Sequence, residues 1–130
     1  MNGAKILCLD DEPVGLTIRA AVLRYAGYKV FTASSDTEAL RILADQPIDI
    51  VINDYLLEGI TGTEVAASMK QIRPNIPILI LSGVTDIPEG MEFADCFLCK
   101  LEPPPVLLAT VANLLAQREV GFGVEKICVA

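Results

Sequence analysis

Five short apolar runs alternate along the chain with segments of helical spacing, and this alternation is the feature that most restricts the fold. The runs have the length of strands and are rich in Ile, Leu and Val; they are Lys5–Leu9, Lys29–Thr32, Ile48–Asn53, Ile76–Leu81 and Cys96–Cys99. Near-continuous apolar strands separated by helices form parallel β-α units, in which helices cover both faces of the sheet. The alternation therefore predicts an α/β fold with a doubly wound, five-stranded parallel sheet.

The segments between the runs carry helix boundaries. Pro13 stands where the first helix is expected to begin and Gly27 where it ends, the positions at which these residues are favoured. Ser35 and Glu38 have the spacing of a capping box, which predicts a second helix that Pro47 ends. Two more helices are predicted over 63–72 and from the prolines at 103–105 to residue 119.

One segment interrupts the alternation of strands and helices. Residues 84–95 stand where another helix is expected, but they include Pro88 and Gly90 and few good helix formers. We predict a short helix at most, or a loop. The chain has 130 residues, the length of an ordinary domain, so residues 1–120 are expected to form a single domain and 121–130 a C-terminal tail.

The composition excludes several classes of protein. The chain contains no histidine, which removes Ser-His-Asp and Cys-His catalysis and every histidine-based metal site. Its formal net charge of -7 repels phosphate backbones, so direct binding of nucleic acid is not expected. The hydrophobic fraction of 52% is too high for a disordered chain and is sufficient for a core.

The sequence carries no recognisable targeting or membrane-spanning segment. The first residues offer one lysine and a short apolar run that ends in two acids, whereas a signal peptide needs a longer apolar stretch. The longest apolar candidate, Pro105–Ala116, is shorter than the roughly 18 residues that a membrane span requires. We therefore expect a cytoplasmic protein without membrane insertion.

The four cysteines are expected to be free thiols, because disulfides are rare in cytosolic proteins. Cys96 and Cys99 form a C-x-x-C, the spacing of redox and metal pairs. They lie in a predicted strand, where residues three apart point to opposite faces, whereas a redox C-x-x-C begins a helix. We interpret the pair as structural.

Unusual polar residues stand where the predicted strands end. They follow the first, third, fourth and fifth strands and are Asp10, Asp11, Asp54, Ser82 and Lys100. In open parallel sheets, ligands bind outside the carboxyl ends of the strands, at the point where the strand order reverses. If the first and third strands are neighbours there, the three carboxylates lie close together.

Carboxylates held close together repel one another, and a hard divalent cation relieves that repulsion. Mg²⁺ is held by one or two carboxylates together with backbone oxygens and waters. With Lys100 beside it, such a cation makes a pocket suited to a phosphoryl group. Each residue also has a structural interpretation: the three acids at 10–12 could cap a helix, and Asp54 could be a turn residue. Ser82 could be a loop hydroxyl and Lys100 a solvated charge. The shared edge of the sheet favours the functional interpretation.

Four motifs cover most of the chain: Leu7-Cys-Leu-Asp-Asp-Glu-Pro13, Asp49-Ile-Val-Ile-Asn-Asp54 with Leu56 and Gly62 after it, Ile78-Leu-Ile-Leu-Ser82-Gly83, and Phe97-Leu-Cys-Lys100. In order and spacing they resemble the receiver domain of two-component response regulators, over about residues 4–118. The resemblance implies a flavodoxin-like fold with strand order 2-1-3-4-5. Residues 1–120 would then be the receiver domain.

The resemblance also implies a phosphoacceptor and a metal site. Asp54 would take a phosphoryl group from a phosphohistidine, on a sensor histidine kinase or on a histidine phosphotransfer protein. Mg²⁺ would be held by Asp10, Asp11 and Asp54 together with the backbone carbonyl of Leu56. The chain would be a signalling domain and not an enzyme, apart from slow self-dephosphorylation.

Three further residues would respond to the phosphoryl group by contact or by movement. Lys100 would pair with its oxygens, Ser82 would move to hydrogen-bond it, and Phe97 would be the switch aromatic that rotates inward. The added charge and acceptor oxygens can bias a two-state loop. The expected output is a changed contact with a downstream protein target.

The sequence departs from the family pattern at two positions near the predicted site. Glu58 and Leu101 stand where the family usually has prolines. The second of these prolines normally follows a cis bond, which costs about 3 kcal/mol before a residue such as leucine, so either this bond is trans or the site tolerates strain.

Leu56 and Val84 occupy the two variable positions that flank the phosphoryl group in the family. Both side chains are apolar and cannot orient an attacking water, which predicts slow self-dephosphorylation.

Other functions remain open at this point. A degenerate receiver would fold without being phosphorylated and would act as a binding module. Enzymes on the same architecture fit less well: a haloacid-dehalogenase-type phosphatase needs Asp-x-Asp after its first strand, where this chain has Asp10-Asp11-Glu12. A Rossmann oxidoreductase needs G-x-G-x-x-G there, and neither that run nor a P-loop occurs in the sequence.

Overall fold

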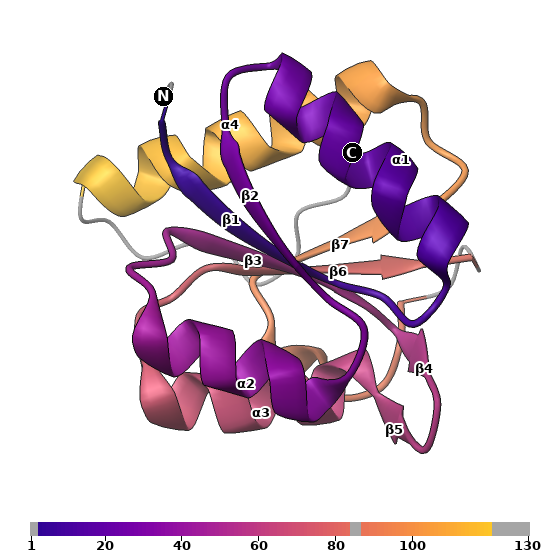
Figure 1. The fold of residues 1–130 in the computed structure, drawn as a ribbon. Helices are drawn as coiled ribbons and strands as arrows, with labels where there is room; N and C mark the ends of the chain where they lie inside the picture. The colour runs from indigo at the N-terminus through magenta and orange to yellow at the C-terminus, as the bar shows by residue number, and fades with distance from the viewer. Residues whose placement is uncertain (1–2, 84–86, 121–130) are drawn as a thin grey trace.

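The predicted strands pair in one parallel sheet, in the order β2-β1-β3-β6-β7 (Figure 1). The computed structural model describes residues 3–83 and 87–120. The strands of the sheet are β1 (Lys5–Leu9), β2 (Lys29–Ala33), β3 (Ile50–Asp54), β6 (Ile78–Ser82) and β7 (Cys96–Cys99). Counted within this sheet alone, the order is 2-1-3-4-5, which confirms the flavodoxin-like α/β prediction.

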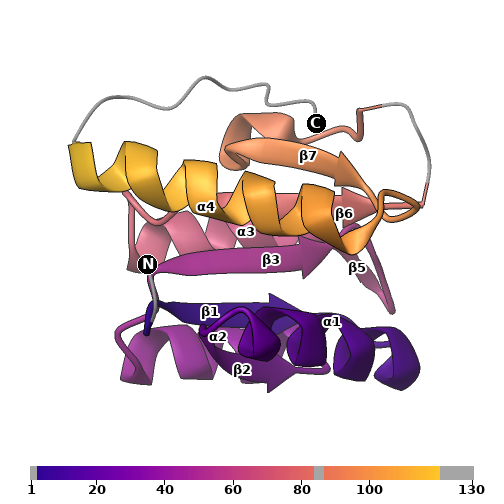
Figure 2. The same cartoon turned by 90° about the horizontal axis from the view of Figure 1, so that it is seen from above.

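Helices cover both faces of the sheet, as Figure 2 shows from above. One face carries α1 (Pro13–Tyr25) and α4 (Pro104–Val120), and the other carries α2 (Asp36–Asp45) and α3 (Gly62–Ile72). Because successive side chains of a strand point to opposite faces, each inner strand contributes to two separate apolar clusters. The sheet is therefore buried on both sides, as the uninterrupted apolar runs predicted.

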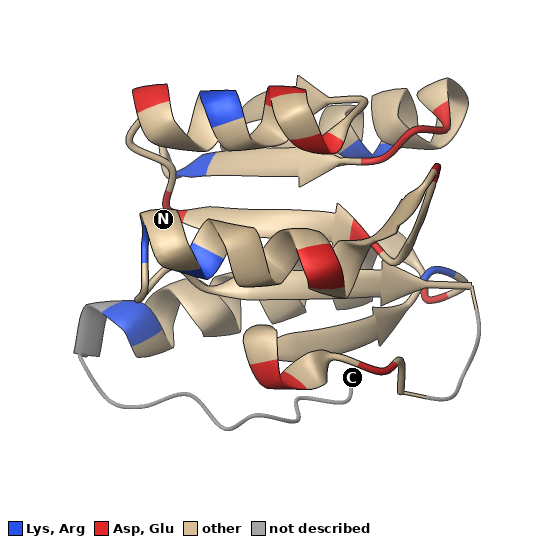
Figure 3. Ribbon diagram, turned by 90° about the horizontal axis from the view of Figure 1, so that it is seen from below, with Lys and Arg blue, Asp and Glu red and all other residues tan. Residues whose placement is uncertain are grey.

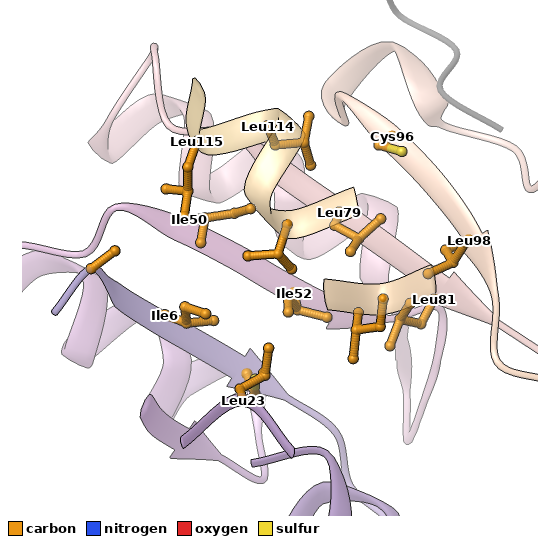
Figure 4. Packing of buried hydrophobic residues seen from close by; sticks show 14 of the residues in the cluster. Ile6, Leu23, Ile50, Ile52, Leu79, Leu81, Cys96, Leu98, Leu114 and Leu115 are labelled. Atoms are coloured by element: carbon orange, nitrogen blue, oxygen red, sulfur yellow. The ribbon is translucent and has the colours of Figure 1, made fainter. Parts of the chain in front are cut away.

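Strand β1 illustrates this division of the core. Ile6 and Cys8 pack against the α1 and α4 side, whereas Leu7 and Leu9 pack against the α2 and α3 side. All four are fully buried, and burial of each large apolar side chain stabilises the fold by about 1.5–3 kcal/mol. Figure 4 shows the first cluster, in which Leu114 and Leu115 of α4 lie over Ile50 of β3.

The helix boundaries follow the predicted signals with one change. Pro13 opens α1, and the side chain of Ser35 accepts a hydrogen bond from the Glu38 N–H at the start of α2. The Glu38 carboxylate accepts from the N–H of Ser34 and not from that of Ser35, so the predicted capping box is shifted by one residue on that side. A complete capping box occurs at Thr61, where α3 begins.

Two connections differ from a simple alternation. Residues 56–61 form an antiparallel hairpin of β4 (Leu56–Leu57) and β5 (Ile60–Thr61). Its turn includes Gly59 at φ +79°, a conformation that glycine adopts without strain. In residues 87–95 the only helix is the single-turn η1 (Met91–Phe93), which agrees with the predicted short helix or loop. Residues 84–86 and the predicted tail, 121–130, lie outside the described residues.

None of the helices in the described ranges is long and apolar enough to cross a membrane. In those ranges Cys8, Cys96 and Cys99 form no disulfide, and Cys128 lies outside them. Cys96 and Cys99 lie in β7 as predicted.

The environment of Cys8 leads to a prediction about its reactivity. Burial raises the pKa of the Cys8 thiol from 9.0 to about 12, although the charges of Arg19 and Arg24 oppose the shift. Since the thiolate is the reactive form, iodoacetamide at pH 8 should leave Cys8 unmodified in the native protein while it alkylates the half-buried Cys99. Peptide mass spectrometry measures both sites. Equal labelling of the two cysteines without denaturant would contradict the burial of β1.

The raised pKa of Cys8 also makes the free energy of unfolding depend on pH. The unfolded thiol loses its proton near pH 9 and the folded one only near pH 12, so the folded state binds more protons in this window. The Cys8 contribution to the free energy of unfolding is therefore present below pH 9 and is lost as the pH rises toward 12.

Candidate functional site

Three carboxylates meet at the carboxyl end of the sheet. Asp10 follows β1 and Asp54 is the last residue of β3, and these two strands are neighbours. Oxygen atoms of Asp10, Asp11 and Asp54 all lie within 4.8 Å of one another. Figure 3 shows acidic and basic positions side by side at this edge of the sheet. The predicted juxtaposition is therefore present in the structure.

Asp10 is held by a backbone group and two cations. Its Oδ1 accepts a hydrogen bond from the Glu12 N–H at 3.0 Å, and its Oδ2 lies 3.2 Å from Arg19 Nη1 and 3.5 Å from Lys100 Nζ. Burial alone raises the pKa of Asp10, but the Glu12 N–H and the charges of Lys100 and Arg19 outweigh it and leave that pKa below its ordinary value. Asp10 is therefore ionised, although it is only 1% exposed.

The pKa of Asp54 lies above the ordinary value of an aspartate. Burial raises its pKa, and the negative charge of Asp10 acts in the same direction. Lys100 opposes both effects, because its Nζ lies 2.8 Å from Asp54 Oδ1. One ammonium group thus bridges Asp54 and Asp10 and compensates part of their mutual repulsion.

Asp11 is exposed and is oriented by the hairpin. Its Oδ2 accepts a hydrogen bond from the Glu58 N–H at 2.7 Å. A proline at position 58, which the family pattern leads one to expect, has no N–H and could not make this bond. Leu56 lies two residues after Asp54 in the same hairpin, with its side chain 66% exposed, and a metal-binding role for its carbonyl stays a prediction.

Glu12, in contrast, follows the structural interpretation. Its carboxylate accepts hydrogen bonds from the N–H groups of Val14 and Gly15 and so caps α1. It is therefore engaged at the helix start and is not one of the clustered carboxylates.

The remaining predicted residues, Ser82 and Phe97, lie on β6 and β7. Ser82, the last residue of β6, is buried, and its carbonyl accepts the Lys100 N–H at 2.7 Å. Phe97 lies in β7 and is only 4% exposed, so its side chain is buried in this structure, and its role as a switch stays a prediction. No peptide bond in the described ranges is cis, so the Lys100–Leu101 bond is trans.

Arg19 was not identified from the sequence, although a signal was available. It lies beside the buried positions of α1, Leu16, Ala20 and Leu23, where a charged side chain needs a partner. Its side chain is 12% exposed and contacts Asp10. The pairing joins two residues nine positions apart, so the partner itself could not be read from local spacing.

Gly62, a residue of the predicted motif, lies in close contact with the backbone of Asp54 and Tyr55. A Cβ atom at this position would collide with the main-chain carbonyl oxygen of Asp54 and would stand 3.1 Å from the Cα of Tyr55. The Gly62 N–H donates to the Tyr55 carbonyl at 2.8 Å. Glycine is therefore required for the start of α3 to approach the end of β3.

The donor set fits a hard divalent cation. The clustered side chains offer only oxygen atoms, and their carboxylates lie close enough to share one ion. Such oxygen ligands suit Mg²⁺, whereas zinc sites in proteins use cysteine and histidine, and the chain contains no histidine.

A parallel sheet in this order, with three carboxylates and a lysine at its carboxyl edge, defines the class of receiver domains. The family model of the response regulator receiver domain matches residues 6–113. The chain belongs to this family, the receiver domains of two-component systems.

Individual proteins agree with this assignment. The chain is 33% identical over 88 residues to the transcriptional regulatory protein GlrR of Escherichia coli, covering 68% of this chain and 20% of that protein. The chain thus spans about a fifth of that relative's length. It is similar to a receiver domain structure from Clostridium thermocellum, with 31% identity, a TM-score of 0.84 and coverage of 92% and 99%.

A third relative was solved with ligands. The response regulator TrrA of Thermotoga maritima, in complex with Mg²⁺ and BeF, has 28% identity and a TM-score of 0.80, and the match covers 85% of this chain and 98% of that one.

Proposed function

We propose that Asp54 accepts a phosphoryl group in a Mg²⁺-dependent reaction and that this modification switches a contact with a downstream protein. The position of Asp54 is the main support for this proposal. Its carboxylate is buried beside two other carboxylates and lies 2.8 Å from Lys100. A nucleophilic carboxylate, a cation site and a fixed ammonium are the parts that phosphoryl transfer needs.

In the proposed reaction, an oxygen of Asp54 attacks the phosphorus of a phosphohistidine on a sensor kinase or a phosphotransfer protein. The bond from phosphorus to the histidine nitrogen breaks, and a phosphoaspartate forms. Lys100 stays at the site and pairs with the phosphoryl oxygens. Asp10, Asp11, Asp54 and the Leu56 carbonyl would hold Mg²⁺, which supplies charge neutralisation at the transferred group. The related response regulator TrrA was solved in complex with Mg²⁺ and BeF, which supports Mg²⁺ as the ion but leaves its ligands a proposal.

The proposed response uses Ser82 and Phe97. Ser82 lies at the end of β6, next to the strand that leads to Lys100, so a hydroxyl can follow the new phosphoryl oxygens there. Phe97, in the neighbouring strand, would report that shift to the surface. The proposal includes a receiver domain over residues 1–120, a cytoplasmic location, and no activity beyond slow loss of the phosphoryl group.

The metal requirement provides the test of this proposal. With acetyl phosphate and Mg²⁺, the intact mass of the protein should increase by one phosphoryl group. With excess EDTA in place of Mg²⁺, the increase should disappear. A folded protein that gains no phosphoryl group in either condition, and binds no Mg²⁺, would support the degenerate binding module instead.

The lifetime of phospho-Asp54 is a separate prediction. The Leu56 side chain is apolar and cannot orient an attacking water; Val84, the other flanking position, lies outside the described residues. Replacing Leu56 with glutamine should shorten the lifetime about tenfold, because an amide can position water. Decay is followed by intact mass after removal of acetyl phosphate. A parent lifetime of only seconds would contradict the prediction.

A further inference from the structure

Arg19 is a cation at the site that the proposed phosphoryl transfer does not use. Its Nη1 lies 3.2 Å from Oδ2 of Asp10, and its side chain is only 12% exposed. Helical side chains lean toward the N-terminus of their helix, and Asp10 precedes that end of α1. The direction of the helix thus sends this arginine into the acidic cluster and away from solvent.

Protein groups engage both oxygens of Asp10. Oδ1 accepts the Glu12 N–H, and Oδ2 faces Arg19 and Lys100. Because Asp10 is 1% exposed, water has little access to replace these partners. A metal ion that uses Asp10 must therefore compete with Arg19 for Oδ2 or share the carboxylate with it.

The formal charge of the site also depends on Arg19. Three carboxylates with Lys100 and Arg19 leave a formal charge of -1 on the site, and without Arg19 the charge is -2. A more negative and less well compensated cluster attracts a divalent cation more strongly.

We propose that Arg19 is a positioning residue, which holds Asp10 in the metal-free protein and weakens the binding of Mg²⁺ by competing for that carboxylate. This proposal rests on the Mg²⁺-dependent function proposed above. It assigns to α1 a part in setting the Mg²⁺ concentration at which the domain becomes competent to react.

The test measures Mg²⁺ affinity by isothermal titration calorimetry at constant ionic strength, without a phosphodonor. Arg19→Met removes the charge but keeps an unbranched side chain, and should bind Mg²⁺ about tenfold more tightly than the parent. Arg19→Lys keeps a cation and should restore an affinity within about twofold of the parent. Arg24→Met is the matched control, because Arg24 lies on the same helix and bonds the Val30 carbonyl outside the acidic cluster.

A second measurement applies if the Arg19→Met variant does not fold in the absence of metal. If Arg19→Met is unfolded without metal, its melting temperature is measured against Mg²⁺ concentration, which yields the same affinity through linkage. Arg19→Gln provides a second neutral variant for the same comparison.

Parent-like or weaker Mg²⁺ binding by Arg19→Met would overturn the proposal and leave the Mg²⁺-dependent function intact. An equal gain in affinity for Arg24→Met would also overturn it, because net charge alone would then explain the effect. If neither the parent nor Arg19→Met binds Mg²⁺, the metal-dependent function itself is wrong.

Discussion

Replacement of Lys100 by methionine is expected to slow phosphoryl uptake by about 100-fold, the scale at which removal of one fixed charge-stabilising donor acts. In the parent, Lys100 Nζ lies 2.8 Å from Asp54 and 3.5 Å from Asp10, so it contacts both the proposed nucleophile and a proposed metal ligand. Methionine keeps the apolar stem and removes the ammonium. The loss therefore concerns charge at the reacting group more than packing.

The rate is measured by intact mass at intervals after addition of acetyl phosphate and saturating Mg²⁺. Lys29→Met serves as the control, since Lys29 is exposed at the start of β2 and loses the same charge. Uptake by Lys100→Met at the parent rate, in a folded protein, would contradict the role given to this lysine.

Replacement of Gly62 by alanine is expected to lower the free energy of unfolding by about 3 kcal/mol, the upper range for inserting one methyl group into a packed site. The new Cβ would collide with the carbonyl oxygen of Asp54 and stand 2.9 Å from its carbonyl carbon. These are backbone atoms, so no side-chain rotation relieves the contact. Either α3 moves away from the end of β3 or Asp54 itself shifts.

Urea denaturation followed by circular dichroism measures this loss. Gly83→Ala is the matched control, because a Cβ at that position meets nothing within 4 Å among the described residues. Equal midpoints for Gly62→Ala and the parent would show that the start of α3 is not held against Asp54 as described.

The sequence was sufficient for the sheet and for most of the site. Each apolar run is long enough to be a buried strand, and parallel strands direct all their carboxyl ends to one edge. Asp10 and Asp54 each stand at such an end, so their proximity followed once β1 and β3 were expected to be neighbours. Lys100, after β7, is placed at the same edge by the same reasoning.

The unpredicted features depend on contacts between segments distant in the chain. The bond from the Glu58 N–H to Asp11 joins residues 47 positions apart, and no local pattern signals it. The short hairpin from Leu56 to Thr61 contains two-residue strands, which are too brief to show a periodicity. At position 58 the sequence showed only a missing proline, whereas the structure shows the hydrogen bond that a proline would remove.

The proposed function depends above all on Asp54 as the phosphoacceptor, and a comparison with the Asp54→Asn variant tests this role. Parent protein and Asp54→Asn are incubated with acetyl phosphate and Mg²⁺, and their intact masses are compared. The variant keeps the size of the side chain and removes the nucleophilic carboxylate. One phosphoryl group should be added to the parent and none to Asp54→Asn. An equal gain in both proteins, or no gain in a folded parent that binds Mg²⁺, would contradict it.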